Sequence, residues 1–213
     1  MISRRATLLG LVAAAPVRAA ASQEQPDMLS FRVLRNGKDI GTHKISFDPA
    51  DNGIDVRIAV DIAYSIGPIT LYRYRLRGLE QWRGGRLVRL DAHTDDDGTA
   101  NFATIARQGQ DLWVTGSSGP GYRAPANALP GTHWNRNELD GPWISPQDGK
   151  LLTHTLADVG SDSLLIGDGA RIGAERFVIS GDVQMELWYT PDRRWVRLRA
   201  PATDGSTILY EPM

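Results

Sequence analysis

Three consecutive carboxylates beside a glycine, Asp95 to Asp97 with Gly98, are the residues whose types and spacing most resemble a cation-binding loop. A calcium loop of the EF-hand kind needs oxygen ligands at alternate positions and a glutamate at its end. Counted from Gly98, the first ligand position holds His93 and the last holds Thr104, so the pattern fails twice. Asp97-Gly98 lies between two strand-like segments and tolerates positive φ. The segment therefore predicts a tight hairpin, with a weak cation site as the lesser alternative.

Other patterns that carry chemistry are incomplete in this sequence. The four histidines show no His-x-x-x-His spacing and no metal-type spacing to a carboxylate, and isolated histidines in strands are usually structural. Cysteine is absent, which excludes thiolate nucleophiles, cysteine-bound zinc and iron–sulfur clusters. Ser117 and Ser118 do not stand in a Gly-x-Ser-x-Gly motif. We predict no catalytic residue, metal site or cofactor. The histidines are His43, His93, His133 and His154.

Paired carboxylates are one catalytic arrangement that sequence spacing cannot reveal, because the two groups need only be close in space. An envelope hydrolase built on such a pair therefore stays open as an alternative. The candidate carboxylates are Glu80, Glu138, Glu175 and Glu186.

The segment from Ala124 to Lys150 is long, rich in proline and glycine, and irregular. Loops of this length inside compact domains are often functional. Aromatic rings with asparagine and arginine beside them suit an amphiphile or a sugar, although they equally suit a plug at one end of a barrel. The candidate ligand-binding residues are His133, Trp134, Asn135, Arg136 and Trp143 of this segment, with Tyr72 and Tyr74 from a neighbouring strand pattern.

A ladder of arginines admits two interpretations. On an outer strand face, these residues would form cross-strand pairs with Asp or Glu. On an inward face, they would line a cationic groove for a carboxylate or phosphate head group. The ladder comprises Arg73, Arg75, Arg77, Arg86, Arg89, Arg197 and Arg199.

The elements that must position these residues follow a period of two from Leu29 onward. Apolar positions alternate with polar ones in segments 55–64, 72–77 and 183–189, which indicates strands with one buried and one solvated face. Turn signals separate the segments at short intervals. They are Asn36-Gly37, Asp51-Asn52-Gly53, Gly84-Gly85, Asp168-Gly169, Pro191-Asp192 and Asp204-Gly205. We count roughly a dozen strands and no amphipathic helix of three turns.

The first 21 residues read as an export signal, with a basic start, an apolar run from Leu8 to Ala15 and small residues before the expected cleavage after Ala19 or Ala21. Ser3-Arg4-Arg5 with Leu8 resembles a twin-arginine signal, although Thr7 and Leu9 depart from that pattern. We therefore expect a periplasmic protein that meets the export translocase through residues 1–21. The apolar run is too short to span a bilayer, and no second run of membrane length follows.

Charge and composition narrow the class of partner. The 213 residues are 41% hydrophobic and 23% charged, as in ordinary globular proteins. Without Arg4, Arg5 and Arg18 of the signal, 21 of the 24 basic side chains remain against 25 acidic ones. A mildly acidic protein is a poor nucleic-acid binder, because that function needs a basic field. We expect one domain over residues 29–213, preceded by a polar tail at 22–28.

Three segments together resemble a known family: "YRYRLRGLEQWRGGRLVRLDAHTDDDG" from Tyr72, "THWNRNEL…SPQDGKL" from Thr132 and "LWYTPDRRWVRLRAPATDGSTILYE" from Leu187. They are similar to the exported bacterial domain-of-unknown-function family 6134, related in style to family 3108. The family carries no established activity, so the resemblance implies no catalytic residues. It implies a single curved antiparallel sheet, loosely similar to the open barrels of periplasmic lipoprotein carriers.

The predicted fold is all-β: a single antiparallel curved sheet of roughly a dozen strands that forms a half-barrel or open β-barrel. The predicted function is non-catalytic binding or carriage of an amphiphilic, lipid-like small molecule. The alternatives are the envelope hydrolase with spatially paired carboxylates and an interaction module whose open sheet edge pairs with a partner strand.

Overall fold

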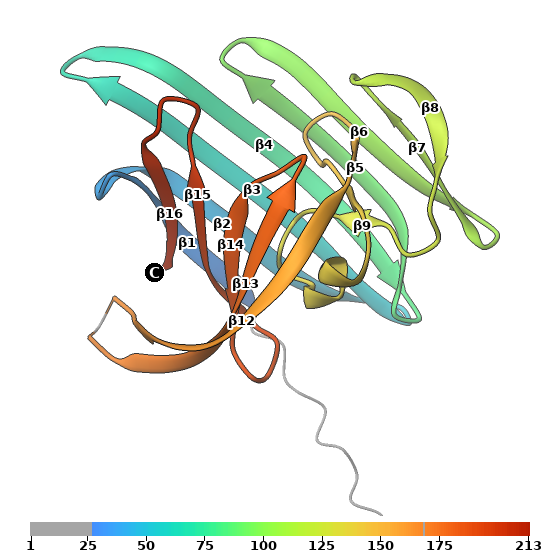
Figure 1. The fold of residues 1–213 in the computed structure, drawn as a ribbon. Helices are drawn as coiled ribbons and strands as arrows, with labels where there is room; N and C mark the ends of the chain where they lie inside the picture. The colour runs from blue at the N-terminus through green and yellow to red at the C-terminus, as the bar shows by residue number, and fades with distance from the viewer. Residues whose placement is uncertain (1–26, 168) are drawn as a thin grey trace, which may run out of the picture.

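The structure is a computed structural model that describes residues 27–167 and 169–213. The predicted export signal lies outside the described residues, as does most of the predicted polar tail. Strands dominate the described chain, as the period-two pattern predicts (Figure 1). Their bounds are β1 Met28–Arg35, β2 Lys38–Ala50, β3 Gly53–Ile66, β4 Ile69–Arg83, β5 Arg86–Asp96, β6 Thr99–Gln108, β7 Asp111–Gly116, β8 Gly119–Ala124, β9 Leu129–Pro130, β10 Trp143–Ile144, β11 Leu151–Leu152, β12 His154–Leu165, β13 Arg171–Gly181, β14 Met185–Tyr189, β15 Trp195–Pro201 and β16 Thr207–Pro212.

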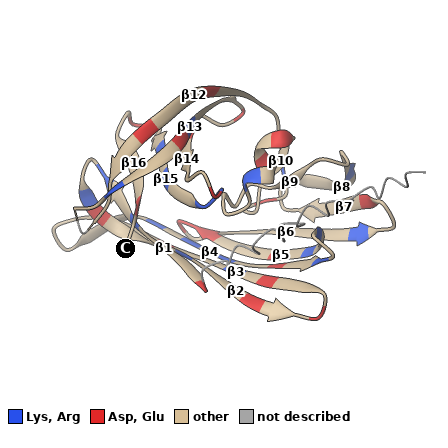
Figure 2. Ribbon diagram, turned by 90° about the horizontal axis from the view of Figure 1, so that it is seen from below, with Lys and Arg blue, Asp and Glu red and all other residues tan. Residues whose placement is uncertain are grey.

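Thirteen of these strands form one sheet in the order β12-β13-β14-β15-β16-β1-β2-β3-β4-β5-β6-β7-β8. Each neighbouring pair in it is antiparallel. The sheet does not close on itself, so β8 and β12 are its two edges. In Figure 2 the strands β12–β16 arch over one face of β1–β8, and β9 and β10 lie between the two halves. The predicted all-β open barrel with a single curved antiparallel sheet is confirmed.

The first and the last described strands pair in the middle of the sheet. β1 pairs with β16 in a register that runs from Phe31 opposite Pro212 to Arg35 opposite Ile208. We call this ladder the β1–β16 seam, because it joins two meanders, β1–β8 and β12–β16, each built from strands consecutive in the chain. The seam is reinforced at one end by the backbone N–H of Thr207, which donates to the side chain of Asn36 at 2.9 Å.

The hairpin turns form where the sequence predicts them, except that Asp168 of the predicted Asp168-Gly169 turn lies outside the described residues. Asp97 and Gly98 have φ values of 51° and 88°, as a two-residue primed turn requires, and they connect β5 to β6. The three neighbouring carboxylates have separate partners: Asp95 accepts from Gly98 N, Asp96 from the Tyr72 hydroxyl, and Asp97 from Arg73 N. The prediction of a tight hairpin at this point is confirmed.

The long segment 124–150 contributes β9, β10 and a short 3₁₀ helix, η1, at Arg136–Asp140. β9 and β10 pair in parallel and β10 pairs antiparallel with β11, which gives a small separate sheet. Ala128, Leu139, Trp143 and Ile144 of this segment are buried in the main core. The segment is therefore packed against the inner face of the large sheet.

The face of each strand is settled by burial. On β3, Val56, Ile58 and Val60 are buried, whereas Arg57 between them is exposed. On β4, Tyr72, Tyr74 and Leu76 face inward, and the arginines that alternate with them are exposed. The apolar face is thus the concave one, because strand side chains alternate between the two faces of a sheet.

Several arginines of the ladder form ion pairs on the outer face. Arg77 makes two hydrogen bonds to Asp61 at 2.7 and 2.8 Å, and both side chains are about half exposed. Arg89 pairs with Asp91, and Arg199 with Glu186. Arg77, Arg89 and Arg199 are exposed positions of their strands, on the face opposite the core. For these three residues the prediction of outer-face ion pairs is confirmed, and the prediction of a cationic groove is wrong.

The tip of the β12–β13 hairpin builds a second, smaller cluster. Leu164 and Ala174 from this hairpin pack with Trp188 of β14 and Val196 of β15. The indole N–H of Trp188 donates to Asp162 at 2.7 Å. The cluster fastens one end of the edge strand β12 to its neighbours, while Leu156 and Val159 nearer its middle stay exposed. Within residues 27–167 and 169–213, no helix is long and apolar enough to cross a membrane.

Candidate ligand cavity

A cavity of about 630 Å³ lies on the concave side. This volume falls within the range of small-molecule binding pockets. Its wall comes from both meanders and from segment 131–133 between them. The apolar lining residues are Ile40, Ile58, Val60, Ile62, Leu76, Pro146, Leu198, Pro201, Ala202 and Ile208. The other lining residues are Arg35, His43, Tyr64, Tyr72, Tyr74, Asp96, Gly131, Thr132, His133, Thr203 and Tyr210.

His43 is a buried imidazole in this wall. It occupies an inward position of β2, in line with Ile45 and Phe47, and is 5% exposed. Neither of its ring nitrogens has a hydrogen-bond partner among the described residues. Burial, with the nearby His133 as a smaller cause, lowers the pKa of His43 to about 3. His43 is therefore neutral at pH 7, with one donor and one acceptor unused.

Aromatic rings surround this imidazole. The ring of Trp195 lies edge-on at 5.3 Å between centroids, and that of Tyr210 lies at 5.7 Å. Trp195 also contacts His133 edge-on at 5.5 Å, so its indole lies beside both histidines. Rings of this size supply a rigid apolar surface, and edge-on geometry is one that aromatic pairs favour.

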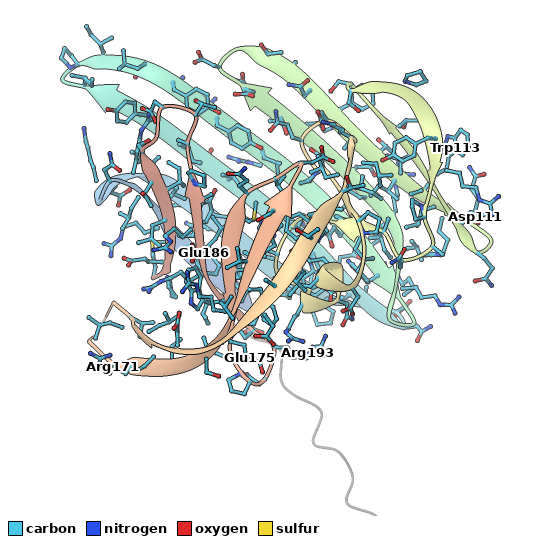
Figure 3. The ribbon with its side chains drawn as sticks, viewed as in Figure 1. Asp111, Trp113, Arg171, Glu175, Glu186 and Arg193 are labelled. Carbon is cyan, nitrogen blue, oxygen red and sulfur yellow. The ribbon has the colours of Figure 1, made fainter. Side chains whose placement is uncertain are left out.

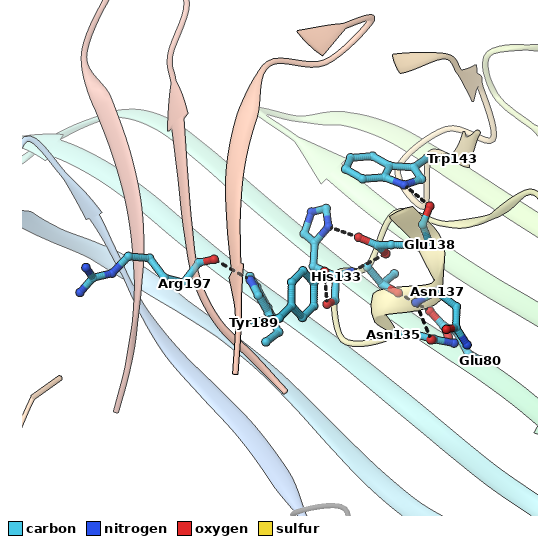
Figure 4. A network of polar contacts seen from close by, with 10 residues as sticks. Glu80, His133, Asn135, Asn137, Glu138, Trp143, Tyr189 and Arg197 are labelled. Carbon is cyan, nitrogen blue, oxygen red and sulfur yellow. Dashed lines mark hydrogen bonds and ion pairs between the residues drawn. The ribbon is translucent and has the colours of Figure 1, made fainter. Parts of the chain in front are cut away.

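His133 is held in one orientation by Glu138, as Figure 4 shows. The Glu138 carboxylate contacts Nδ1 of the ring at 2.7 Å and accepts from the His133 backbone N–H at 2.8 Å. His133 has a φ of 68°, a left-handed conformation that is uncommon for a non-glycine residue. Its carbonyl accepts from the buried Tyr189 hydroxyl at 2.9 Å. These contacts leave Nε2 as the ring nitrogen not engaged by Glu138.

A second buried carboxylate, Glu80 of β4, ties segment 124–150 to the sheet. It accepts hydrogen bonds from Trp82 Nε1 at 2.6 Å, from Thr132 Oγ1 at 2.7 Å and from Trp134 Nε1 at 3.0 Å. Burial raises the pKa of Glu80 to about 7, although the three donors act in the opposite direction. Glu80 is fully buried and does not line the cavity, so its role is to hold the cavity wall in place.

Phenols and one carboxylate mark another part of the wall. Tyr72 donates to Asp96 at 2.8 Å, and Gln147 donates to the other carboxylate oxygen at 3.2 Å. Burial, with the bond to Asp96, raises the pKa of Tyr72, and burial raises that of Tyr74. Burial also raises the pKa of Tyr210 to about 12. All three phenols are therefore neutral hydrogen-bonding groups at pH 7.

Arg35 is the arginine of the cavity wall. Its guanidinium forms an ion pair with Asp204 and lies 4.1 Å from the centroid of the Tyr64 ring. The charge is thus matched by an acid and covered by an aromatic face. The cavity does not present this arginine as a free cation.

The structure distributes the predicted ligand-binding residues over two environments. His133, Tyr72 and Tyr74 line the cavity, although they are far apart in the sequence. Trp134 and Trp143 pack in or against the core, and Trp143 is only 1% exposed, with its indole N–H on the Glu138 carbonyl at 2.8 Å.

The remaining two predicted residues belong to η1 and its start. Asn135 is the N-cap, and its side-chain oxygen accepts from Asn137 N. Arg136 pairs with Glu175 at 2.9 Å and lies over the Phe177 ring. Neither residue lines the cavity. Their contacts position the segment that carries His133.

Sequence reasoning missed His43, which it assigned to the structural class of isolated strand histidines. A usable signal was present, since His43 falls on the apolar side of a strand that continues with Ile45 and Phe47. A polar residue on a buried face needs a partner. Sequence reasoning also gave Tyr64 and Tyr210 no role in a ligand site, and it assigned Asp96 to the predicted hairpin or weak cation site.

The four carboxylates proposed for a hydrolase have internal partners and do not line the cavity. Glu80 and Glu138 are buried in the networks described above. Glu175 pairs with Arg136, and Glu186 with Arg176 and Arg199; Figure 3 labels both glutamates on the β13–β14 half of the sheet. The geometry therefore offers this alternative no pair of free acids beside the cavity.

A family model described as a domain of unknown function, DUF6134, matches residues 31–213. The chain belongs to the DUF6134 family. This membership covers nearly all of the described residues and confirms the resemblance found in the sequence. No functionally curated protein matches the chain.

Among solved structures, this DUF6134 chain is similar to a β-barrel-like protein of domain of unknown function DUF1849 from Brucella abortus. The two share 6% sequence identity with a TM-score of 0.59, over 87% of this chain and 94% of the other. At this identity the likeness establishes the fold alone, and it supports the open-barrel architecture.

Proposed function

We propose that this DUF6134 protein is a non-catalytic binding or carrier protein for an amphiphilic, lipid-like small molecule. The observation that carries the proposal is the concave cavity of about 630 Å³, whose wall of aliphatic and aromatic residues contains a buried imidazole without a partner. An apolar pocket with a few polar groups is the common design of small-molecule sites. The aliphatic wall suits an alkyl chain, and the imidazoles and phenols suit its polar end.

Export to the periplasm is part of the proposal and rests on the sequence of residues 1–21. In the aqueous periplasm, such a carrier would shield sparingly soluble molecules from water. The absence of cysteine is compatible with it, because the core provides the stability that disulfides provide in many exported domains.

The test is native mass spectrometry of the protein purified from its own host, followed by organic extraction. The expected result is a co-purifying molecule of a few hundred daltons that extraction removes. The matched variants are Ile62→Trp, which fills the cavity, and Ala63→Trp, which adds the same ring to the outer face of the same strand. Ile62→Trp should lose the molecule and Ala63→Trp should keep it. A clean apo mass for wild type, with no titrated amphiphile bound, would contradict the proposal.

A strand-pairing module remains the second candidate because of one observation. The edge strand β12 has 12 residues, and Leu156 and Val159 on it are 41% and 51% exposed. Exposed apolar edge strands are templates for pairing with another strand. Sedimentation of wild type and of a Leu156→Lys, Val159→Lys variant tests this candidate: it requires an association that the two lysines abolish.

A further inference from the structure

Arg35, Asp96 and His133 face the cavity, and each already has a protein partner. Arg35 pairs with Asp204 and is covered by the Tyr64 ring. Asp96 accepts from Tyr72 and from Gln147. His133 rests against the Glu138 carboxylate through Nδ1. Outside these pairs, the described lining is aliphatic, aromatic or neutral and polar.

A charged ligand would therefore have to compete for its counter-ion. A carboxylate or phosphate would share Arg35 with Asp204, whose charge already offsets that of the guanidinium, or would remain unpaired beside Asp96. An ammonium group would have to take Asp96 from two donors. Burial of an unpaired charge is far more costly than burial of a hydrogen-bonded neutral group.

A neutral hydroxyl group finds what it needs in the same wall. His43 has an unused donor and an unused acceptor, and burial keeps its imidazole uncharged. The phenol of Tyr74 also lines the cavity. A hydroxyl can donate to one nitrogen of the imidazole or accept from the other, so it can supply one of the two partners that His43 lacks.

From the matched charges and the unpartnered His43, we infer that the cavity selects uncharged, hydroxyl-bearing apolar molecules over fatty-acid anions, phospholipids and alkylamines. This inference rests on the proposed function and specifies its ligand class. The structural elements that enforce the selection are the Arg35–Asp204 pair, the Tyr72–Asp96–Gln147 group and His43.

The test uses the full exported protein and a series of probes that share one ten-carbon chain. Decan-1-ol, monodecanoylglycerol, decanoate, decylamine and decyl methyl ether are titrated at pH 7.5 by isothermal calorimetry. The alcohol and the glyceride should bind at least about tenfold more tightly than the two charged probes. Decyl methyl ether, which cannot donate, should bind more weakly than the alcohol.

Two variants assign the selection to the named groups. His43→Phe keeps an aromatic ring among Phe31, Trp195 and Tyr210 and should reduce the preference for alcohol over methyl ether to near unity. Arg75→Gln, on the exposed face of β4, serves as the control and should leave the whole series unchanged. Folding of both is checked by near-ultraviolet circular dichroism.

The outcomes separate the inference from the proposed function. Decanoate or decylamine binding as tightly as decan-1-ol would overturn the inference and leave an amphiphile-binding protein. Binding of none of the five probes, together with a clean apo mass, would overturn both. An alcohol-over-ether preference that His43→Phe leaves intact would overturn the role of His43.

Discussion

Trp134 donates its indole N–H to Glu80 across 3.0 Å, although the two residues are 54 positions apart in the chain. Trp82 and Thr132 donate to the same carboxylate, so one buried acid joins β4 to the segment that closes the cavity. The wall contributed by Thr132 and His133 is thus fixed by hydrogen bonds to the sheet. The position of this part of the wall therefore depends on the Glu80 side chain and on whether it is protonated.

Replacement of Glu80 by glutamine should remove one component of the pH dependence of stability. Burial raises the pKa of Glu80 from 4.5 to about 7, so the folded state binds the proton more tightly than the unfolded chain. This stabilisation is complete below pH 4.5 and is lost as pH rises through 7, with a slope of about 1.4 kcal/mol per pH unit. Glu80→Gln mimics the protonated acid and should lack this slope in urea titrations from pH 4 to 8.

The control for Glu80→Gln is Glu80→Ala, which leaves two indole N–H groups and a hydroxyl without their acceptor. Each orphaned group costs on the order of 1–3 kcal/mol. Glu80→Ala should therefore be strongly destabilised at every pH. An identical pH dependence of stability in Glu80→Gln and in wild type would show that Glu80 does not titrate in this range.

His43 should make the opposite contribution. Its pKa is lowered from 6.5 to about 3, mainly by burial, so the unfolded chain binds the proton more tightly. The stabilisation is complete above pH 6.5 and is lost as pH falls toward 3. Between pH 4.5 and 6.5 the two slopes oppose each other, so their combined contribution to the wild-type stability should be nearly flat there.

The single variants should reveal the two slopes separately. Across pH 4.5 to 6.5, the free energy of unfolding should rise with pH in Glu80→Gln and fall with pH in His43→Phe. The double variant should again be flat. Parallel curves for the two single variants would refute this assignment.

Removal of the Tyr189 hydroxyl should loosen His133. In Tyr189→Phe the buried carbonyl of His133 loses its donor, which costs about 1–3 kcal/mol in denaturant titrations. The matched control is Tyr122→Phe, because Tyr122 donates to the Gly149 carbonyl at the same distance of 2.9 Å from a partly exposed position. Tyr122→Phe should lose less stability, because water can donate to the Gly149 carbonyl in place of the missing hydroxyl. An equal loss in both variants would argue against a special role for the His133 backbone.

The outer-face ion pairs should differ in how much they contribute to the free energy of unfolding. Arg77–Asp61 is an isolated, half-exposed pair, so Asp61→Asn should change the free energy of unfolding by less than about 1 kcal/mol. Glu186 instead receives both Arg176 and Arg199, and both guanidinium groups lie near the Trp188 ring. Glu186→Gln should cost more, and its effect should weaken in 1 M salt. Equal effects would mean that the cluster behaves as separate surface pairs.

Export can be tested without reference to the fold. Substitution of both Arg4 and Arg5 by lysine should block twin-arginine export while keeping the positive charge of the N-terminus. The processed form should then disappear from the periplasmic fraction, and N-terminal sequencing of the wild-type form should begin after Ala19 or Ala21. Unchanged export of the double-lysine variant would point to the general secretion route.

Much of the fold was predictable because its signals are local. Asn36-Gly37 and Asp97-Gly98 form turns with positive φ, and the alternation of Val56, Ile58 and Val60 identifies a buried face. The site was predictable in part: Tyr72 and Tyr74 share an inward face that their spacing reveals. Glu80 and Thr132 are 52 positions apart, and no local pattern pairs them. The role of His43 likewise depends on rings from other strands, so alternation shows its face but not its surroundings.

The β1–β16 seam has a consequence for how the chain folds. Each of the other ladders of the large sheet joins strands that follow one another in the sequence, so both meanders can form progressively by local hairpins. The seam instead joins residues such as Asn36 and Thr207, which are 171 positions apart, and its closure carries the largest entropic cost. Ile208 and Tyr210 of β16 belong to the cavity wall. The cavity therefore cannot be complete until the last six-residue strand has joined the first.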